Sequence, residues 1–330
     1  MDDKAKESRL RGEILPLLRC VKCGGERLQP DGAQLECAQC RQRYPVHHGT
    51  PVMLLEPGAA FEFTSPMVTE HVYSGAIAEV LRRSAGKRIL DVGAGSNPQE
   101  HEGIVKLDVF ALPHVDVAGM AEKLPFRDGV FDAVVSGAVL EHVSNPFMAA
   151  DQMHRVLKEG GEVYIETAFL QPVHAYPNHF FNMTVSGAQY LFSNFERMEA
   201  GVRPYQNPSF TLHWLLEAWT RKLKGARKDE FLRATVGEIL AEYKQHDLSQ
   251  RWMDGFSDKD RAELACGVFF HGRKTTVTAG RGHGVALRPP LPPAPVTLAA
   301  RLYDPVRKWG VRLHAAARKA KSKLLGKKKE

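Results

Sequence analysis

The segment from residue 87 to residue 109 constrains the fold of this chain more than any other. Residues 89–92 (ILDV) read as a short apolar strand with an acid, Asp91, near its end, and Gly93-Ala94-Gly95 follows directly. Glycines at such a strand end let the backbone turn sharply and let a ligand approach with no Cβ in the way. A second strand, 103–109, carries Asp108, whose carboxylate can accept both hydroxyls of a ribose. The pattern predicts a nucleoside site at the edge of a sheet.

The spacing within this segment argues against NAD. Asp108 lies thirteen residues after Gly95, whereas a full dinucleotide-binding unit needs about twenty. Ser96, Asn97 and Pro98 stand where a third glycine would be. A pyrophosphate requires that glycine and the helix N-terminus behind it. We therefore expect a shortened first crossover and a ligand other than NAD.

The rest of the chain alternates strand and helix patterns. Strands are predicted at 115–120, 130–137 and 162–168, with near-continuous apolar character typical of parallel sheets. A helix is predicted from Pro66 to Arg83, and another begins at Asn145-Pro146 and stops at Gly160-Gly161. A helix at 186–195, a strand at 195–204, a helical insertion at about 207–264 and a last strand at 266–274 complete a doubly wound α/β fold.

Four of the five cysteines form two Cys-x-x-Cys pairs, Cys20 with Cys23 and Cys37 with Cys40, separated by thirteen residues. Two such turns can bring four sulfurs onto one tetrahedral metal, and zinc suits thiolates in that geometry. Two disulfides are the alternative, but an intracellular chain would keep them reduced. Four thiolates leave zinc no open position, so the predicted metal is structural.

Both regions resemble known families. CVKCGGERL, LECAQC and YPVHHGTPVML, within about residues 14–55, are similar to the zinc-ribbon family of small methyltransferase activator proteins, which also occurs fused in front of methyltransferase domains. ILDVGAGSNP, KLDV, EKLPFRDGVFDAVVSGAVLEHVSNP and RVLKEGGEVYIET, in that order, resemble class I S-adenosylmethionine (SAM)-dependent methyltransferases of the ubiquinone/menaquinone-biosynthesis type. This second resemblance covers about residues 64–275 without the insertion. It implies SAM as cofactor and leaves the acceptor open.

The methyltransferase resemblance also implies roles for individual residues. It assigns the methionine part of SAM to the glycine turn and the ribose to the acid of the second strand. The adenine is assigned to the loop after the third strand. The end of the fourth strand is assigned to the methyl side. The residues so implied, in chain order, are Asp91, Gly93, Gly95, Asp108, Val109, Ala121, Glu122, Ser136 and Gly137.

An oxygen or nitrogen acceptor usually must lose a proton, and a neutral histidine suits that task near pH 7. Open α/β sheets place their sites beyond the carboxyl ends of the strands. The candidates there are His142 in LEHV and His174, Tyr176 and His179 in PVHAYPNHFFNMT. This second loop resembles one in methyltransferases found beside surface-polysaccharide enzymes, although Asn178 stands where that pattern often has an acid. Each histidine has the alternative of a packed loop residue, and Glu141 and Glu166 are expected to be structural.

The net charge of +7 is concentrated at the C-terminus. Residues 301–330 carry eleven Lys or Arg and two acids, a net +9, which leaves −2 for the first 300 residues. The main domain is therefore not a general nucleic-acid binder. In the tail, one helical stripe comprises Leu302, Val306, Trp309, Leu313, Ala316, Ala320 and Leu324. A basic amphipathic helix favours an anionic membrane surface, with RNA and a solvated tail as alternatives.

These observations predict five segments. They are a flexible N-terminus (1–13), a zinc ribbon (14–56), a methyltransferase domain (62–275), a Pro-rich linker (276–297) and a basic amphipathic helix (298–330). No run approaches the roughly 18 apolar residues of a membrane span, so we expect a cytoplasmic protein, held peripherally at the inner membrane face. The predicted activity is O-methylation of a small-molecule or a glycan- or lipid-linked acceptor. RNA methylation and a non-catalytic SAM-binding adaptor are the alternatives.

Overall fold

The computed structural model describes residues 3–55, 72–174, 179–196, 198–203, 205–206, 208–239, 255–257 and 260. The predicted last strand (266–274), the Pro-rich linker, the basic helix and the expected helix start at Pro66 lie outside the described residues. So does most of the second half of the predicted insertion.

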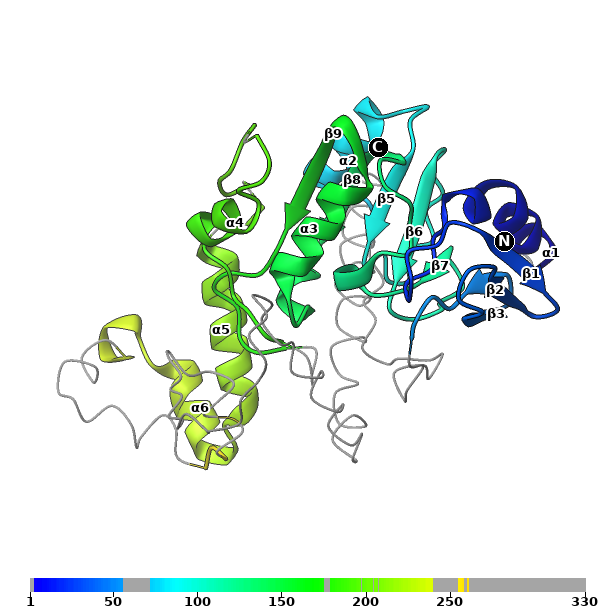
Figure 1. Ribbon diagram of the computed structural model, residues 1–330. Coiled ribbons are helices and arrows are strands. Elements are labelled where there is room, and N and C mark those ends of the chain that lie inside the picture. The colour runs from blue at the N-terminus through cyan, green and yellow to red at the C-terminus, as the bar shows by residue number, and fades with distance from the viewer. Residues whose placement is uncertain are drawn as a thin grey trace, which may run out of the picture.

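A five-stranded parallel sheet forms the centre of the molecule (Figure 1). Its strands are β5 (Ile89–Val92), β6 (Ile104–Asp108), β7 (Val117–Ala118), β8 (Phe131–Gly137) and β9 (Leu157–Glu166), in the spatial order β7-β6-β5-β8-β9. The pairing is parallel throughout, with Ile89 opposite both Ile104 and Ala133. The first strand of this sheet in the chain, β5, is therefore central. The next strands are added on one side of β5, and from β8 onward they are added on the other side. In open α/β sheets, ligands bind at the point where the strand order reverses in this way.

Helices cover both faces of this sheet, as the doubly wound prediction requires. Alternate residues of a strand point to opposite faces. Leu90 and Val92 belong to the same buried cluster as α3 (Pro146–Val156). Ile89 packs instead with Val80 and Leu81 of α2 (Gly75–Arg83). The shortened first crossover is also confirmed, because residues 93–103 contain no helix between β5 and β6.

Two predicted helix boundaries are corrected. Residues 72–74 are not helical, so α2 begins at Gly75 and not at Pro66. Asn145 caps α3 as predicted, with its side chain accepting from Met148 N at 3.0 Å. However, α3 ends at Val156, and Gly160-Gly161 lies inside β9 and not at a helix end. Strand pairing with β8 begins as early as Leu157 and overrides the glycines there.

The predicted strand at 195–204 is wrong for the residues that the structure describes there. Side chains of this segment form hydrogen bonds within the segment, and its backbone forms no strand pairing there. Arg203 N donates to Gln206 Oε1 at 2.9 Å, and the Arg203 guanidinium forms two hydrogen bonds with the carboxylate of Glu199. Short polar contacts of this kind compete with strand pairing. The helix predicted just before this segment is present as α4 (Val185–Leu191).

The N-terminal part of the chain forms a second, antiparallel sheet. Its strands, in order, are β1 (Leu28–Asp31), β2 (Gln34–Cys37), β3 (Arg43–His47) and β4 (Thr50–Pro51). The expected flexible N-terminus is corrected for residues 3–13. These residues form α1 (Asp3–Arg9) and most of a π-helical turn, η1 (Leu10–Ile14), which a 3₁₀ turn, η2 (Leu15–Leu17), follows. Burial of Leu10 and Ile14 fixes this helical segment, which carries too few apolar residues to stand out in the sequence.

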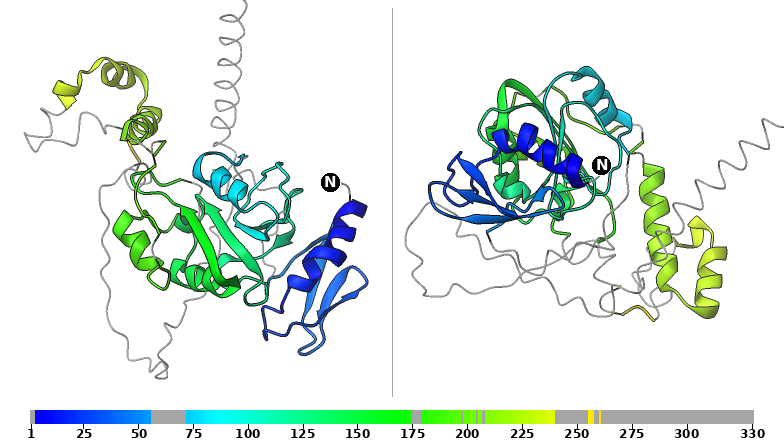
Figure 2. Two further views of the ribbon diagram at one scale, coloured as in Figure 1. Left: turned by 90° about the horizontal axis from the view of Figure 1, so that it is seen from above. Right: turned by 90° about the vertical axis from the view of Figure 1, so that its right-hand side faces the viewer.

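The N-terminal module and the α/β domain share one hydrophobic core. Leu18 and Tyr44 of the module belong to the same buried cluster as Phe126 of the α/β domain. The backbones are also joined, since Leu18 pairs with Phe126 and Val52 pairs with Ala118 of β7. The module thus extends the β7 edge of the sheet, and it lies at the opposite end of the molecule from α5 and α6 (Figure 2).

The predicted insertion is helical where it is described. It contains α5 (Pro208–Lys222) and α6 (Gly225–Arg233), which pack through Leu223, Trp219 and Phe231. Helix α6 ends at Arg233, and the chain leaves it at Ala234 in an extended conformation. Within the described part of the chain, we find no helix that combines the length and apolarity needed to span a membrane.

Candidate functional site

The glycine turn after β5 lies against the carboxyl end of β6. Gly93 N and Ala94 N both donate to Leu107 O, at 2.8 and 3.0 Å. Gly93 and Gly95 have φ values of +80° and +59°, which side chains disfavour. A Cβ on Gly93 would lie 2.2 Å from a methyl group of Val139. The predicted glycines are therefore required by the backbone and by close packing.

Asp108 binds this turn directly. Its carboxylate accepts from Gly95 N at 2.9 Å through Oδ2 and from Phe110 N at 3.0 Å through Oδ1. The side chain is nearly buried, with 8% of its surface exposed. Asp108 thus holds the turn in place at the carboxyl end of β6.

Asp91 is buried beside the same edge and has a partner that sequence reasoning missed. Tyr73 OH donates to Asp91 Oδ2 at 2.7 Å, and burial raises the pKa of Tyr73, so the phenol remains a donor. On the neighbouring strand Ser136 is fully buried, and its hydroxyl donates to Val92 O at 2.9 Å. Ser136 therefore ties β8 to β5 just below the turn.

The other predicted cofactor residues on this side follow β6 and β7. Val109 follows Asp108 and is partly exposed, and Ala121 and Glu122 form a 3₁₀ turn, η4 (Ala121–Lys123). Glu122 Oε1 accepts from both the backbone N and the hydroxyl of Ser144, at 3.2 and 3.0 Å. Glu122 thus holds the loop between β8 and α3, a contact that the sequence did not predict.

Three imidazoles gather beyond the carboxyl ends of β8 and β9. The ring centroids of His142 and His174 are 5.1 Å apart, those of His142 and His179 are 5.4 Å apart, and those of His174 and His179 are 4.4 Å apart. Trp214 of α5 lies over His174, with a centroid distance of 5.3 Å. The structure thus brings together all three predicted histidines. Tyr176, the fourth candidate, lies outside the described residues.

Hydrogen bonds distinguish the histidines of this loop. Nδ1 of His174 faces the carbonyl oxygen of Pro172 at 3.0 Å, so Nδ1 donates and Nε2 carries the lone pair. Burial lowers the pKa of His174 to about 4, which makes it neutral near pH 7. His179 Nδ1 instead accepts from the backbone N of His174 at 3.2 Å, and its Nε2 bonds Asn182 Oδ1 at 2.9 Å. His179 therefore positions the loop, and His174 has a nitrogen to offer a ligand.

The acid next to His142 lies in the same place. Glu141 is fully buried in a 3₁₀ turn, η5 (Leu140–His142), and its Oε2 accepts from Thr167 Oγ1 at 3.0 Å. Its backbone oxygen accepts from the amides of Phe180 and Phe181, which anchors the histidine loop to η5. One donor atom each from Glu141, His142 and His174 lies within 4.8 Å of the others.

The four predicted cysteines also converge. All four sulfurs lie within 4.8 Å of one another, with 3.6 Å between Cys20 and Cys40 and 3.7 Å between Cys23 and Cys37. Zn–S bonds of about 2.3 Å in a tetrahedron put sulfurs roughly 3.8 Å apart. The chemistry and spacing of these donors therefore fit a zinc ion.

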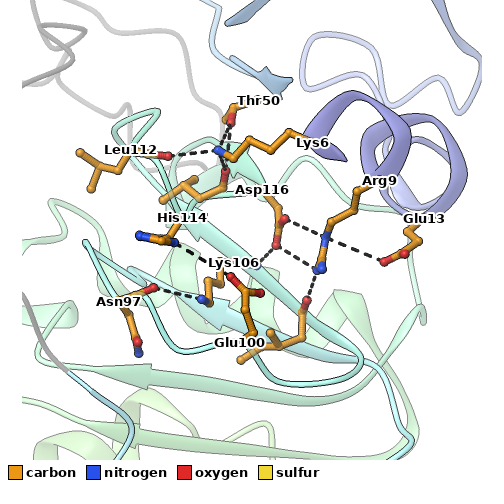
Figure 3. A network of polar contacts seen from close by, with 12 residues as sticks. Lys6, Arg9, Glu13, Thr50, Asn97, Glu100, Lys106, Leu112, His114 and Asp116 are labelled. Atoms are coloured by element: carbon orange, nitrogen blue, oxygen red, sulfur yellow. Dashed lines mark hydrogen bonds and ion pairs between the residues drawn. The ribbon is translucent and has the colours of Figure 1, made fainter. Parts of the chain in front are cut away.

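A polar network joins the N-terminal helix to β6 and β7 (Figure 3). Arg9 donates to Asp116 Oδ2 at 3.3 Å and to Ile104 O at 2.5 Å. Its Nε lies 2.9 Å from Asp116 Oδ1, an ion-pair contact without hydrogen-bond alignment. Lys6 Nζ, from the same helix, bonds Thr50 Oγ1 and Val115 O, both at 3.1 Å.

The network continues to the glycine turn through Lys106. Asp116 Oδ2 accepts from Lys106 N at 2.8 Å, and the buried Lys106 Nζ donates to the carbonyl oxygen of Asn97 at 3.0 Å (Figure 3). Lys106 Nζ also donates to the carbonyl oxygen of Gln99 at 2.5 Å. Burial raises the pKa of Asp116 and lowers that of Lys106. The loop after Gly95 is therefore held by Lys106, which is linked through Asp116 to Arg9 of the N-terminal helix.

Comparison with known proteins identifies the α/β domain. The family described as "Methyltransferase domain" matches residues 74–165. A ubiquinone biosynthesis O-methyltransferase from Pseudomonas aeruginosa is 26% identical over 184 residues, which covers 48% of this chain and 73% of that protein. A demethylmenaquinone methyltransferase from Renibacterium salmoninarum is 38% identical over 99 residues, covering 24% and 40% of the two chains.

The chain contains a class I SAM-dependent methyltransferase domain. Among solved structures, a chain of the Haloferax volcanii complex that contains the Trm112 methyltransferase activator is similar, with a TM-score of 0.30 and 19% identity over 36% of this chain and 64% of that one. Haemonchus contortus phosphoethanolamine N-methyltransferase 2 has a TM-score of 0.33 and 17% identity, over 57% of this chain and 48% of that one.

The edge of the methyltransferase sheet fits SAM. The two glycines of the turn, Gly93 and Gly95, carry no Cβ, and the nearly buried carboxylate of Asp108 lies beside them. Asn97 is fully buried, and among the described residues its Nδ2 finds no hydrogen-bond acceptor. A buried donor of this kind is costly unless a ligand completes it. When bound, SAM supplies an electrophilic methyl group on sulfur.

Some residues that shape the methyltransferase site carried no clear signal in the sequence. Tyr73 precedes α2 without any motif, and Glu141 was expected to be structural only. Lys106 did carry a signal, because a lysine between the apolar residues of the stretch IVKL needs a buried partner. What the sequence could not supply was that partner, since Asn97 and Gln99 approach Lys106 only in the folded loop.

Proposed function

We propose that this methyltransferase transfers the methyl group of SAM to a hydroxyl oxygen of a small ring-containing acceptor, such as a phenol or quinol. The group of three imidazoles beyond β8 and β9 carries the proposal. An oxygen nucleophile must lose a proton, and His174, which donates through Nδ1, offers the lone pair of Nε2 as a proton acceptor. The Pseudomonas relatives, which are named as O-methyltransferases of ubiquinone biosynthesis, agree with an oxygen acceptor.

On the cofactor side, each predicted residue receives a role. Gly93 and Gly95 let the methionine part of SAM approach the backbone beside Asp91. Asp108 accepts from the ribose hydroxyls, with Val109 next to it. Ala121 and Glu122 flank the adenine, and Ser136 and Gly137 form the wall on the methyl side. Positioning of this kind supplies much of the rate of an in-line displacement.

On the acceptor side, Trp214 offers an aromatic surface beside His174. An acceptor ring that stacks there would direct its hydroxyl toward His142 and His174. His179 would act through its bond to the backbone of His174 and would not touch the acceptor. This arrangement favours a compact ring over a long polymer, although a glycan- or lipid-linked ring would fit the same chemistry.

We also propose that the four cysteines bind structural zinc, which holds the N-terminal module against β7. The basic segment 298–330 lies outside the described residues. We propose that it binds an anionic membrane surface. It would then hold the enzyme close to membrane-dissolved acceptors.

The test is methyl transfer to a panel of acceptors. Full-length protein is incubated with isotopically labelled SAM and a catechol, a hydroquinone, a primary amine or total RNA, and products are identified by mass spectrometry. We expect methyl ethers from the phenolic acceptors. His174→Gln should lower kcat by roughly 10²–10⁴, as loss of proton transfer does, while His213→Gln on the exposed face of α5 should not.

Label in RNA or in the amine, with none in the phenols, would reject the proposed small phenolic acceptor. Binding of SAM without label in any acceptor of a cell extract would instead favour the adaptor alternative.

A further inference from the structure

The carboxylate of Glu141 is in an unusual position for a structural acid. It is fully buried, and although Oε2 accepts from Thr167, Oε1 has no hydrogen-bond partner among the described residues. Burial of a carboxylate oxygen without compensation is costly, and proteins offset that cost with a proton, a paired charge or a metal ion. Glu141 therefore requires a further partner on its Oε1 side.

Two imidazoles lie close to this carboxylate. Donor atoms of His142 and His174 are within 4.8 Å of each other and of a carboxylate oxygen of Glu141. Nδ1 of His174 donates to Pro172 O. Metal-binding histidines commonly donate their second nitrogen to a carbonyl in this way, which fixes the tautomer and aims the other nitrogen at the ion.

The loop that carries His174 is held from several sides. His179 Nδ1 accepts from His174 N, and Asn182 bridges His179 Nε2 to the carbonyl oxygen of Gln171. The amides of Phe180 and Phe181 bond the backbone oxygen of Glu141 itself. The two segments that supply the three donors are thus joined to each other, so their spacing is set by the fold.

We propose that Glu141, His142 and His174 bind one divalent first-row transition-metal ion. Two imidazoles and one carboxylate suit Mn²⁺, Fe²⁺, Co²⁺ or Zn²⁺, whereas Mg²⁺ and Ca²⁺ prefer sites made of oxygen. Three protein ligands leave coordination positions open, as in catalytic and not in structural sites.

The consequence for catalysis rests on the proposed oxygen acceptor. The ion lowers the pKa of an acceptor hydroxyl that reaches it, and the proton leaves to solvent. As the oxygen–carbon bond forms, the carbon–sulfur bond of the sulfonium breaks, which gives a methyl ether and neutral S-adenosylhomocysteine. In the metal-loaded protein His174 is a ligand, and the ion takes over the task of the base.

Binding of Mn²⁺, followed by electron paramagnetic resonance, tests the site without any acceptor. Thiolates discriminate against Mn²⁺, so the cysteine cluster with its zinc does not interfere. We expect one Mn²⁺ per full-length chain. Glu141→Gln and His174→Ala should each weaken binding by at least roughly 100-fold, the upper range for loss of a mere supporting partner. His213→Ala, an exposed histidine on α5, is the matched control and should bind Mn²⁺ as the wild type does.

Further measurements distinguish a misfolded variant from one that has lost only the metal site. Each variant should still bind S-adenosylhomocysteine in calorimetry. Mn²⁺ should raise the unfolding temperature of the wild type and not that of Glu141→Gln, because only a bound ion stabilises the native state. In metal-free buffer Glu141→Gln should be at least as stable as the wild type, since a neutral amide relieves the buried charge.

The proposal is overturned if the wild type binds no Mn²⁺, Co²⁺ or Zn²⁺ beyond the cysteine cluster, or if both variants bind as well as the wild type. Stoichiometric Mn²⁺ without any methyl ether would support the metal site and reject the oxygen acceptor. Methyl ether formed at full rate by protein stripped of all but its cysteine-bound zinc would reject the catalytic role of the ion.

Discussion

Replacement of Arg9 by methionine tests whether the N-terminal helix stabilises the methyltransferase domain. The ion pair between Arg9 and Asp116 is largely buried, with side-chain exposures of 18% and 13%. Loss of one partner of a buried pair costs about 3–5 kcal/mol, because the other charge remains buried and uncompensated. The residual exposure favours the lower end, so we expect Arg9→Met to lower the free energy of unfolding by about 3 kcal/mol.

The assay is thermal and urea unfolding of the full-length protein. For a domain of this size 1 kcal/mol corresponds to roughly 2–4 °C, so the unfolding temperature should fall by about 6–12 °C. Arg11→Met is the matched control, because Arg11 lies in the adjoining helical turn with its side chain exposed. It should change stability by no more than about 0.5 kcal/mol.

A double-mutant cycle with Asp116→Asn separates the ion pair from other effects. The asparagine oxygen can still accept from Lys106 N, which Asp116 binds at 2.8 Å. In that background Arg9→Met no longer leaves a buried charge, so the double variant should be more stable than the sum of the single effects by about 1–2 kcal/mol. Additivity within about 0.5 kcal/mol would refute the pairing, as would an Arg9→Met variant as stable as the Arg11→Met control.

Three other predictions concern the cofactor loop and the cysteines. Lys106→Met should weaken S-adenosylhomocysteine binding at least about tenfold in calorimetry, some 1.4 kcal/mol, because the carbonyl oxygens of Asn97 and Gln99 lose their donor. Burial lowers the pKa of Lys106, so the folded state holds that proton less tightly than the unfolded state; stability should rise with pH toward lysine's ordinary value of 10.5, and Lys106→Met should flatten that rise. Gly93→Ala should destabilise the protein by more than about 1 kcal/mol, since φ is +80° and its Cβ would meet Val139; a neutral result in urea unfolding would contradict the packing. Cys23→Ser, or extraction of zinc by a strong chelator, should lower the unfolding temperature of the whole methyltransferase and not of a separate small transition, because the cores are continuous.

Much of the cofactor edge was predictable because its signals are local. Gly93 and Asp108 lie within one short stretch of chain, and each is demanded by a backbone turn or a strand end. The spacing of the cysteines likewise involves only a few residues, and it is enough to predict that the four sulfurs converge. Boundaries were less predictable where pairing overrode propensity, as at Gly160-Gly161, which lies inside β9 because β8 pairs with it.

The acceptor side depended on contacts between distant segments. The histidines were visible as candidates, but nothing local separated His174, which keeps a nitrogen for a ligand, from His179, whose two nitrogens are both used by the loop. Glu141 could not be recognised either, since a glutamate in a turn is ordinary unless its surroundings are known. Its burial arises when the loop after β9 folds back and bonds its backbone oxygen.

By itself, the sequence determined the parallel α/β domain, the cofactor class and a cluster of four thiols, because each of these follows from short-range rules of turns, strand ends and ligand spacing. Only the tertiary structure decided that residues 3–13 form a helix against β6 and β7, and that an acid and two imidazoles from separate loops meet. Those features depend on which distant surfaces exclude water together, and no local pattern encodes that.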